Sequence, residues 1–355
     1  MYNILLLLLI IIILLIFTYS KNNYEHFTSI NIPLNQFPFI GAHNAITGSI
    51  DNNINNLYLD TLIKFNESIP IMKTQSLSLI KLYEKGIRFF DLRIDLEKNF
   101  KSLFSNKNNV WFHHTVPLIN MDNSRDLIEL INIAILEKTL IVLYFSHYTI
   151  NNENDIINLI NIYFNKNNFI NNFTLINTDI KNNLSTTIQS FLNKNIYIVG
   201  IVNGKTKYIQ DNYDQNISCF IDSKTCINNI PKSIDESKNN LWIKLKEYMD
   251  NSNNNYQNHI NNIKNDKSMY ITQVFFQTPT DIINILNLLY YTNFNKDSLL
   301  KLNNELDLNY KIANYIKDNN LKSNVFLFDS IKDDNTIPLL KQYIESQINY
   351  SYHFL

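Results

Sequence analysis

The sequence predicts a single α/β barrel, in which parallel strands are covered by helices. Short runs rich in β-branched and aromatic residues alternate with helical patterns from Phe37 onwards. These runs are almost continuously apolar, which is typical of parallel strands buried on both faces. No linker divides the pattern, so about seven strands over roughly 310 residues fit one closed barrel better than two domains.

The first half of the chain gives four strands and three helices. Strands are expected at 37–44, 87–95, 110–115 and 140–149. A helix over 74–86 has apolar residues at helical spacing, with Thr74 as a cap and Gly86 at its end. A capped amphipathic helix over 122–138 and an Asn-rich helical pattern over 151–168 separate the later strands.

The second half repeats the alternation with weaker signals. The expected strands lie at 196–202, 269–279 and 324–331. Residues 251–267 are rich in Asn and Lys and are expected to form a loop. The expected helices lie at 241–249, 280–291, 297–319 and 336–347.

The N-terminus carries an uninterrupted apolar run. Residues 4–17 read ILLLLLIIIILLIF, which is short for a membrane-spanning helix but has only a weak signal-peptide cleavage site after it. We therefore expect an uncleaved membrane anchor at 1–20, with a cleaved signal peptide and secretion as the alternative. A polar tether is expected at 21–35 and the catalytic barrel at 36–350.

Composition excludes several classes of protein. The formal net charge is −1 and 45% of residues are hydrophobic, which argues against a nucleic-acid binder and against a disordered chain. The chain has only 5 Gly and three arginines, and most of these lie between Gly41 and Arg93. Residues that are scarce in the whole chain but concentrated in one stretch indicate that the structure or the function needs them in that stretch.

Polar side chains recur where the predicted strands end. In a parallel barrel the catalytic groups lie at the carboxyl ends of the strands, so these side chains are expected to converge. Asp91 and Arg93 alternate on one strand and therefore face the same side. The residues concerned are His43, Asn44, Asp91, Arg93, His113, His114, Ser146, His147 and Asp329.

Two histidines, a guanidinium and a carboxylate suit the cleavage of a phosphodiester. One histidine can accept a proton from an attacking hydroxyl while the other protonates the leaving oxygen. An arginine can stabilise the charge on the phosphoryl oxygens, and an aspartate can orient the basic histidine.

Six segments carry a family resemblance. They are GAHNAITG (41–48), QSLSLIKLYEKGIRFFDLRID (75–95), VWFHHT (110–115), LIVLYFSHYT (140–149), ITQVFFQTPT (271–280) and NVFLFDSI (324–331). In this order and spacing they resemble the X-domain family of phosphatidylinositol-specific phospholipases C, in its small single-domain form. The resemblance extends from about residue 37 to about residue 350.

The resemblance implies a distorted TIM-type (β/α)8 barrel and a role for each matching residue. His43 matches the general base that activates the inositol 2-hydroxyl, which then expels diacylglycerol and leaves a cyclic inositol phosphate. His114 matches the general acid, and Asp329 the partner of the base. Arg93 matches the cation that bacterial members use in place of calcium, so no cofactor is expected. The implied partner is a membrane phospholipid, phosphatidylinositol or its glycan-linked form.

Some residues depart from the pattern or keep alternatives open. Bacterial members usually carry Asp after the first histidine, where Asn44 stands here, so the acid step is expected to be slower. Asp91 and His147 are expected to bind substrate. The alternative for Asp91 is an ion pair that only orients Arg93, and the alternative for His147 is a supporting hydrogen bond. A glycerophosphodiesterase or sphingomyelinase D type of enzyme would need E-x-D where this chain has D-L-R. An anchored binding protein with a weakened site is the remaining alternative.

Overall fold

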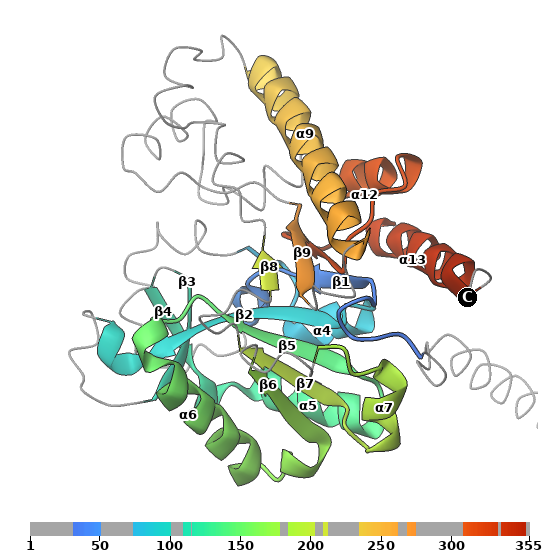
Figure 1. Ribbon diagram of the computed structural model, residues 1–355. Helices are drawn as coiled ribbons and strands as arrows, with labels where there is room; N and C mark the ends of the chain where they lie inside the picture. Colours follow the sequence, from blue (N-terminus) through green and yellow to red (C-terminus); the bar gives the residue numbers. More distant parts are fainter. Residues whose placement is uncertain are drawn as a thin grey trace, which may run out of the picture.

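The computed structural model describes residues 31–50, 74–100, 109–114, 116–177, 184–202, 209–211, 234–261, 268–274, 308–332 and 335–352. These residues form an α/β fold with a mostly parallel sheet and helices around it (Figure 1). The predicted anchor at 1–20, most of the predicted tether and the predicted helix at 280–291 lie outside them. Among the helices that the structure describes, none combines the length and apolar character needed to cross a bilayer.

Eight strands form the parallel path of the sheet. Their order is β6-β7-β5-β2-β1-β10-β9-β8, and every neighbouring pair on this path is parallel. They are β1 (Phe39–Ala42), β2 (Phe89–Leu96), β5 (Ile141–Ser146), β6 (Phe173–Asn177), β7 (Ile198–Val202), β8 (Ile209–Asp211), β9 (Met269–Gln273) and β10 (Val325–Phe328).

The barrel expected from the sequence is confirmed in part, because the described strands form a half-barrel of parallel strands. Within the described residues β6 and β8 are the two ends of the path and no pairing joins them, so this part of the sheet is open. The chain also leaves simple barrel order after β5, because β7 takes the place beside β5 and β6 pairs on the outer edge of β7. Local periodicity predicts a strand but carries no information on which neighbour it pairs with.

One predicted strand does not belong to the parallel path. β3 (Val110–His114) pairs antiparallel with the end of β2, and β4 (Val116–Asn120) pairs antiparallel with β3. This ribbon extends the sheet beside β2 and brings His114 towards the carboxyl ends of the parallel strands.

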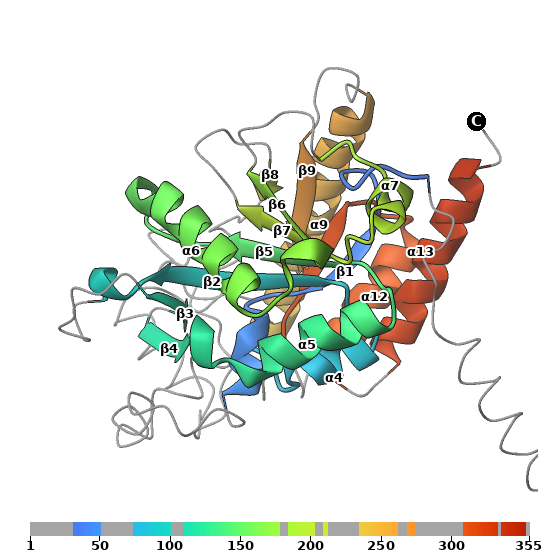
Figure 2. The ribbon, with the colours of Figure 1, turned by 90° about the horizontal axis from the view of Figure 1, so that it is seen from below.

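The helices cover the sheet on more than one side. Figures 1 and 2 both place α9 beside β9, α13 beside β1 with α12 next to it, and α5 and α6 on the side of β5. The rings of Trp242 in α9 and Tyr315 in α12 meet edge to face, 5.9 Å apart. The main helices are α4 (Leu79–Glu84), α5 (Arg125–Leu136), α6 (Glu153–Lys166), α7 (Ile188–Asn193), α9 (Ile234–Asn261), α12 (Leu308–Asp318) and α13 (Thr336–Tyr352).

The Asn-rich segment from residue 251 is helical up to Asn261, so the predicted loop is wrong there. Packing outweighs the low helix propensity of asparagine. The Ser252 hydroxyl lies 2.7 Å from that of Thr272, and the ring of Tyr256 meets that of Tyr270. The sequence also gave no signal for β4, β6, β8 or α7, all of which are short.

Thr74 does not cap a helix as predicted. Helix α4 begins at Leu79, and Ser78 caps it by accepting a hydrogen bond from the Lys81 amide. The segment 74–78 instead runs along the carboxyl ends of β1 and β10, where Thr74 accepts a hydrogen bond from the Ser330 amide.

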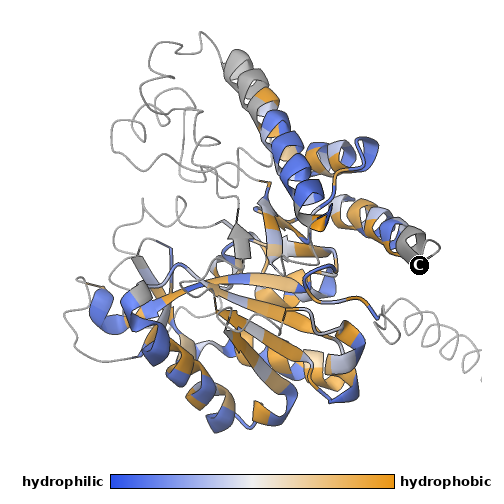
Figure 3. Cartoon of the chain, in the orientation of Figure 1, coloured by the Kyte–Doolittle hydropathy of each residue, from blue (hydrophilic) through white to orange (hydrophobic). Residues whose placement is uncertain are grey.

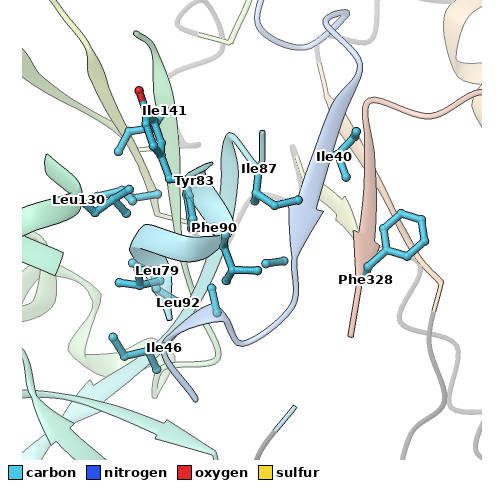
Figure 4. Close-up of a cluster of buried hydrophobic side chains, with 14 of the residues drawn as sticks. Ile40, Ile46, Leu79, Tyr83, Ile87, Phe90, Leu92, Leu130, Ile141 and Phe328 are labelled. Atoms are coloured by element: carbon cyan, nitrogen blue, oxygen red, sulfur yellow. The ribbon is translucent and has the colours of Figure 1, made fainter. Parts of the chain in front are cut away.

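Alternation along each strand divides the core into two layers. Phe39, Phe89, Val142 and Val325 face an inner cluster of apolar side chains. Their neighbours Ile40, Phe90, Leu143 and Phe326 face an outer cluster beneath the helices. Figure 3 shows that most of the parallel strands are largely hydrophobic, and Figure 4 shows Leu79 and Tyr83 of α4 in the outer cluster beside Phe90 and Ile87. Burial on both faces explains why the strand segments read as continuous apolar runs.

Candidate active site

The predicted site residues share one face of the sheet. Each of the three central residues lies an even number of positions after a residue of the inner face. His43 follows Phe39 in this way, Arg93 follows Phe89, and Asp329 follows Leu327. Side chains alternate along a strand, so these three point to the inner side, as do Asp91 and Ser146. The register places Arg93 opposite Ser146 on β5. The inner layer is therefore apolar along the strands and polar at their carboxyl ends.

His43 is held between a carboxylate and a guanidinium. Its Nδ1 lies 2.7 Å from Asp329 Oδ1, and Arg93 Nη2 contacts its Nε2. A guanidinium can only donate hydrogen bonds, so Nε2 must be the unprotonated nitrogen of a neutral ring. The proton therefore sits on Nδ1 and is donated to Asp329. This arrangement leaves a lone pair on Nε2, the atom that a general base uses.

The electrostatics of the cluster keep His43 neutral. Burial lowers the pKa of His43 well below its usual value, and the positive charge of Arg93 lowers it further. Burial raises the pKa of Asp91 and of Asp329, and Arg93 opposes the rise in both. The single guanidinium thus stabilises two buried carboxylates and destabilises an imidazolium between them.

Asp91 is fixed by two donors. Its Oδ2 accepts the backbone N–H of Asn44 at 3.0 Å, and its Oδ1 accepts the Ser146 hydroxyl at 2.5 Å. The Ser146 oxygen in turn lies 2.9 Å from Nδ1 of His147. Between Asp91 and Arg93, both of which the structure describes, no ion pair is formed, so that alternative for Asp91 is not observed.

The second histidine of the predicted pair faces the first. The ring of His114, at the end of β3, lies 6.5 Å from the ring of His43 and is almost perpendicular to it. His114 and His113 are half-buried, and His147 is exposed at the rim of the cluster. His113 donates from Nε2 to the His147 carbonyl at 3.2 Å. This contact links the β3 ribbon to the end of β5.

Three of the seven described non-glycine residues with left-handed backbone lie at the same end of the sheet. Asn44, His147 and Ser330 have φ values of 44°, 59° and 54°. Each lies one or two residues beyond a strand, after β1, β5 and β10 respectively. Left-handed backbone is unfavourable for residues other than glycine and tends to occur at functional sites.

Sequence reasoning missed the residue that joins the ends of β1 and β10. Gln75 is completely buried, and its Nε2 donates to the carbonyls of His43 at 2.9 Å and Phe328 at 2.8 Å. Its Oε1 accepts the Ile331 amide. Asn309 of α12 supports the same region by donating to the Asp329 carbonyl at 2.7 Å. No local pattern marks either residue, because both act on backbone groups that are distant in sequence.

The structure thus brings all seven predicted site residues to one end of the sheet. His43, Asn44, Asp91, Arg93, Asp329 and, through Ser146, His147 form one contact network, with His114 facing His43. Their catalytic and binding roles stay predictions. Within the part of the chain that the structure describes, no three His, Cys, Asp or Glu side chains are grouped as a metal site requires.

Comparisons with known proteins give distant structural likenesses. No protein-family model matches the chain, and no curated protein matches it. The chain is similar to phosphatidylinositol-specific phospholipase C from Listeria monocytogenes, with 14% identity and a TM-score of 0.48 over 89% of this chain and 95% of that chain. A variant of the Staphylococcus aureus phosphatidylinositol-specific phospholipase C is 15% identical, with a TM-score of 0.48 over 90% of this chain and 95% of that chain. Because these likenesses are distant, the assignment of a function rests on the geometry of the site.

Proposed function

We infer that the chain is a phosphodiesterase of the phospholipase C type, which cleaves phosphatidylinositol or a glycan-linked form of it. The products are diacylglycerol and a cyclic inositol phosphate. The observation that carries this proposal is the contact of His43 with both Asp329 and Arg93, which keeps the basic nitrogen unprotonated beside a phosphate-binding group.

His43 is the general base of the reaction. Its Nε2 takes the proton from the inositol 2-hydroxyl, whose oxygen attacks the phosphorus. The imidazolium that forms keeps its Nδ1–H hydrogen bond to Asp329 at 2.7 Å, so its positive charge arises beside a carboxylate. The nucleophile belongs to the substrate, and this step needs no activated water.

Arg93 has to change partner when substrate enters. Its Nη2 occupies the lone pair of His43 Nε2, so the base is blocked while this hydrogen bond exists. A phosphoryl oxygen is a stronger acceptor for a guanidinium than a neutral imidazole, because both partners are charged. Substrate phosphate therefore draws Arg93 away from His43. The same movement frees the base and provides the charge that stabilises the transition state.

His114 is the general acid. The separation of 6.5 Å between its ring and that of His43 allows the two side chains to act on different oxygens of one phosphodiester. Protonation of the diacylglycerol oxygen by His114 completes the exchange, since the bond from phosphorus to that oxygen breaks as the cyclic phosphate closes. His147, which is exposed at the rim, is assigned to the binding of the headgroup, and the buried Asp91 is assigned to its support.

The reaction is expected to proceed without a metal. Arg93 carries a permanent positive charge at the place where a divalent cation would have to neutralise the phosphate, and the two cations would repel each other. Activity on phosphatidylinositol is therefore expected to be the same with a calcium chelator or with added calcium. Activity that disappears with the chelator would contradict this part of the proposal.

The test is product analysis with the full chain in detergent, added to vesicles that contain phosphatidylinositol. Phosphorus NMR should detect a cyclic inositol phosphate, and vesicles of phosphatidylcholine should remain intact because choline has no hydroxyl beside the phosphate. His43→Ala and His114→Ala should each reduce the rate by about a thousandfold. Arg125→Lys, an exposed change at the start of α5, is the control and should have no effect.

A folded wild-type protein that forms no cyclic inositol phosphate would contradict the phospholipase proposal. In that case the weakened binding protein becomes the better interpretation, since His43, Arg93 and Asp329 would then form a site without turnover. Circular dichroism of every variant distinguishes a chemical loss from an unfolded chain.

A further inference from the structure

We propose that the Asn44 carboxamide and the Arg93 Nε–H together form a binding site for one oxygen of a phosphoryl group. This proposal rests on the proposed function and adds a role for a residue that departs from the family pattern. Both Asn44 side-chain atoms and Arg93 Nε are buried without a hydrogen-bond partner among the described residues. The exposed fractions are 0% for Asn44 and 8% for Arg93.

Asn44 carries two energetic costs in the free protein. Its backbone is left-handed, with φ 44° and ψ 50°, although the side chain has a Cβ. It precedes the short helix η1 (Ala45–Ser49) at the capping position, yet its side chain makes no capping hydrogen bond. A buried amide without a partner costs about 1–3 kcal/mol. Two unfavourable features at the residue next to the predicted base indicate a role in binding.

The backbone of Asn44 is held in place independently of its side chain. Its N–H donates to Asp91 Oδ2 at 3.0 Å, and its carbonyl accepts the hydroxyl of Thr47 at 2.9 Å. The carboxamide is therefore positioned by the backbone and is not needed to maintain the fold. A rigidly held donor is what the stabilisation of a developing charge requires.

Arg93 supplies the second donor on the side of the base. In a guanidinium the Nε–H and the Nη2 amino group lie along one edge, and Nη2 is the atom that contacts His43 Nε2. An oxygen bound along this edge would therefore lie next to the basic nitrogen. Entry of the oxygen opens the Arg93–His43 hydrogen bond, which is the exchange that frees the base.

The positive charge of Arg93 attracts an anion to the proposed site, and burial, which raises the pKa of Asp91 and of Asp329, lessens the opposing negative charge. The carboxylates of Asp91 and Asp329 are already engaged by the Asn44 amide, the Ser146 hydroxyl and the His43 ring, so neither needs a further cation. An aspartate at position 44 would add a third carboxylate to this buried cluster and would repel phosphate. The neutral amide keeps the shape of that side chain and adds a donor.

Three substitutions test the proposal on the full chain. Asn44→Gly removes the carboxamide and relieves the left-handed backbone, Asn44→Asp keeps the shape and adds charge, and Asn168→Gly is the matched control. Asn168 is exposed and has φ 61°, so glycine relieves the same strain there without touching the site. Binding of inorganic phosphate is measured by calorimetry, with myo-inositol as the uncharged probe, and thermal unfolding is measured without ligand.

Asn44→Gly should weaken phosphate binding by about tenfold or more, the loss expected for one hydrogen bond to a charged group. It should also raise the melting temperature by about 2 °C, because an unpaired amide and a strained backbone are removed together. Asn44→Asp should weaken phosphate binding more strongly. Asn168→Gly should leave phosphate binding unchanged, and no variant should change the affinity for myo-inositol by a comparable factor.

The result separates this proposal from the proposed function. If the wild type binds phosphate through Asn44 but cleaves no phosphatidylinositol, the phospholipase proposal fails and the phosphoryl site stands. If Asn44→Gly retains wild-type phosphate affinity, or if the wild type binds no phosphate, the phosphoryl site is wrong whatever the protein cleaves.

Discussion

Asp329 Oδ1 lies 2.7 Å from His43 Nδ1, although 286 positions separate the two residues in the chain. They meet because β1 and β10 are neighbours in the sheet, with Ala42 opposite Phe328, and each of the two residues directly follows its strand. The predicted base therefore exists only when the first and last described strands have paired. Folding of the sheet and assembly of the site are the same event at this point.

Asp329→Asn should reduce kcat by about 10²- to 10⁴-fold with little change in global fold. The amide can present an N–H to His43 Nδ1, which favours the tautomer that is protonated on Nε2 and places that proton against Arg93. Nitrogen NMR of the imidazole should report the change of tautomer directly. Asp122→Asn, an exposed change, is the control, and an unchanged tautomer in Asp329→Asn would contradict the role given to Asp329.

Arg93→Met should raise the pKa of His43, because the positive charge that disfavours the imidazolium is removed. The rise should be partial, since burial is the larger cause of the low pKa and persists in the variant. In the wild type the base stays neutral well below pH 6.5, so the contribution of His43 to activity is lost as pH falls through this lowered pKa. Proton NMR titration of His43 measures the shift without substrate, with Arg125→Met as the control. A pKa of His43 in Arg93→Met that is equal to or lower than that of the wild type would refute the coupling.

Gln75→Leu should lower both stability and kcat, because the carbonyls of His43 and Phe328 and the Ile331 amide lose a buried partner. Each unsatisfied group costs about 1–3 kcal/mol, although relaxation and water recover part of the sum. The loss in kcat should exceed any rise in KM, since the base and Asp329 move relative to each other. Gln342→Leu on the exposed side of α13 is the matched control. If Gln75→Leu has the same kcat as Gln342→Leu, the role of Gln75 is structural only.

Ser146→Ala and Ser124→Ala make a matched pair of buried hydroxyl deletions. The Ser146 hydroxyl donates to Asp91 at 2.5 Å, whereas the Ser124 hydroxyl has no partner among the described residues. Removing the first should destabilise the protein by about 1–3 kcal/mol and raise the pKa of Asp91 further, and removing the second should be neutral or stabilising. Urea unfolding of both variants gives the comparison, and equal effects would contradict the structural role of Ser146.

The local pattern of the sequence was sufficient for most of the strands and for the chemistry of their ends. A strand buried on both faces has to be apolar along its length, so β1, β2, β5, β7, β9 and β10 are visible as runs. The polar residues that interrupt such runs stand out for the same reason, as with Asp91 and Arg93. Short or Asn-rich elements, such as β6 and the second half of α9, gave no such signal because their stability comes from packing.

The sequence by itself determined which groups could do chemistry and roughly where each strand ends, since both depend on a few neighbouring residues. The tertiary structure decided the strand order, the antiparallel course of β3, the tautomer of His43 and the position of Gln75. Each of these depends on contacts between segments far apart in the chain, whose free energies are set only when the sheet has assembled. The unpaired amide of Asn44 belongs with them, because a missing partner is a property of the folded surroundings and not of the residue.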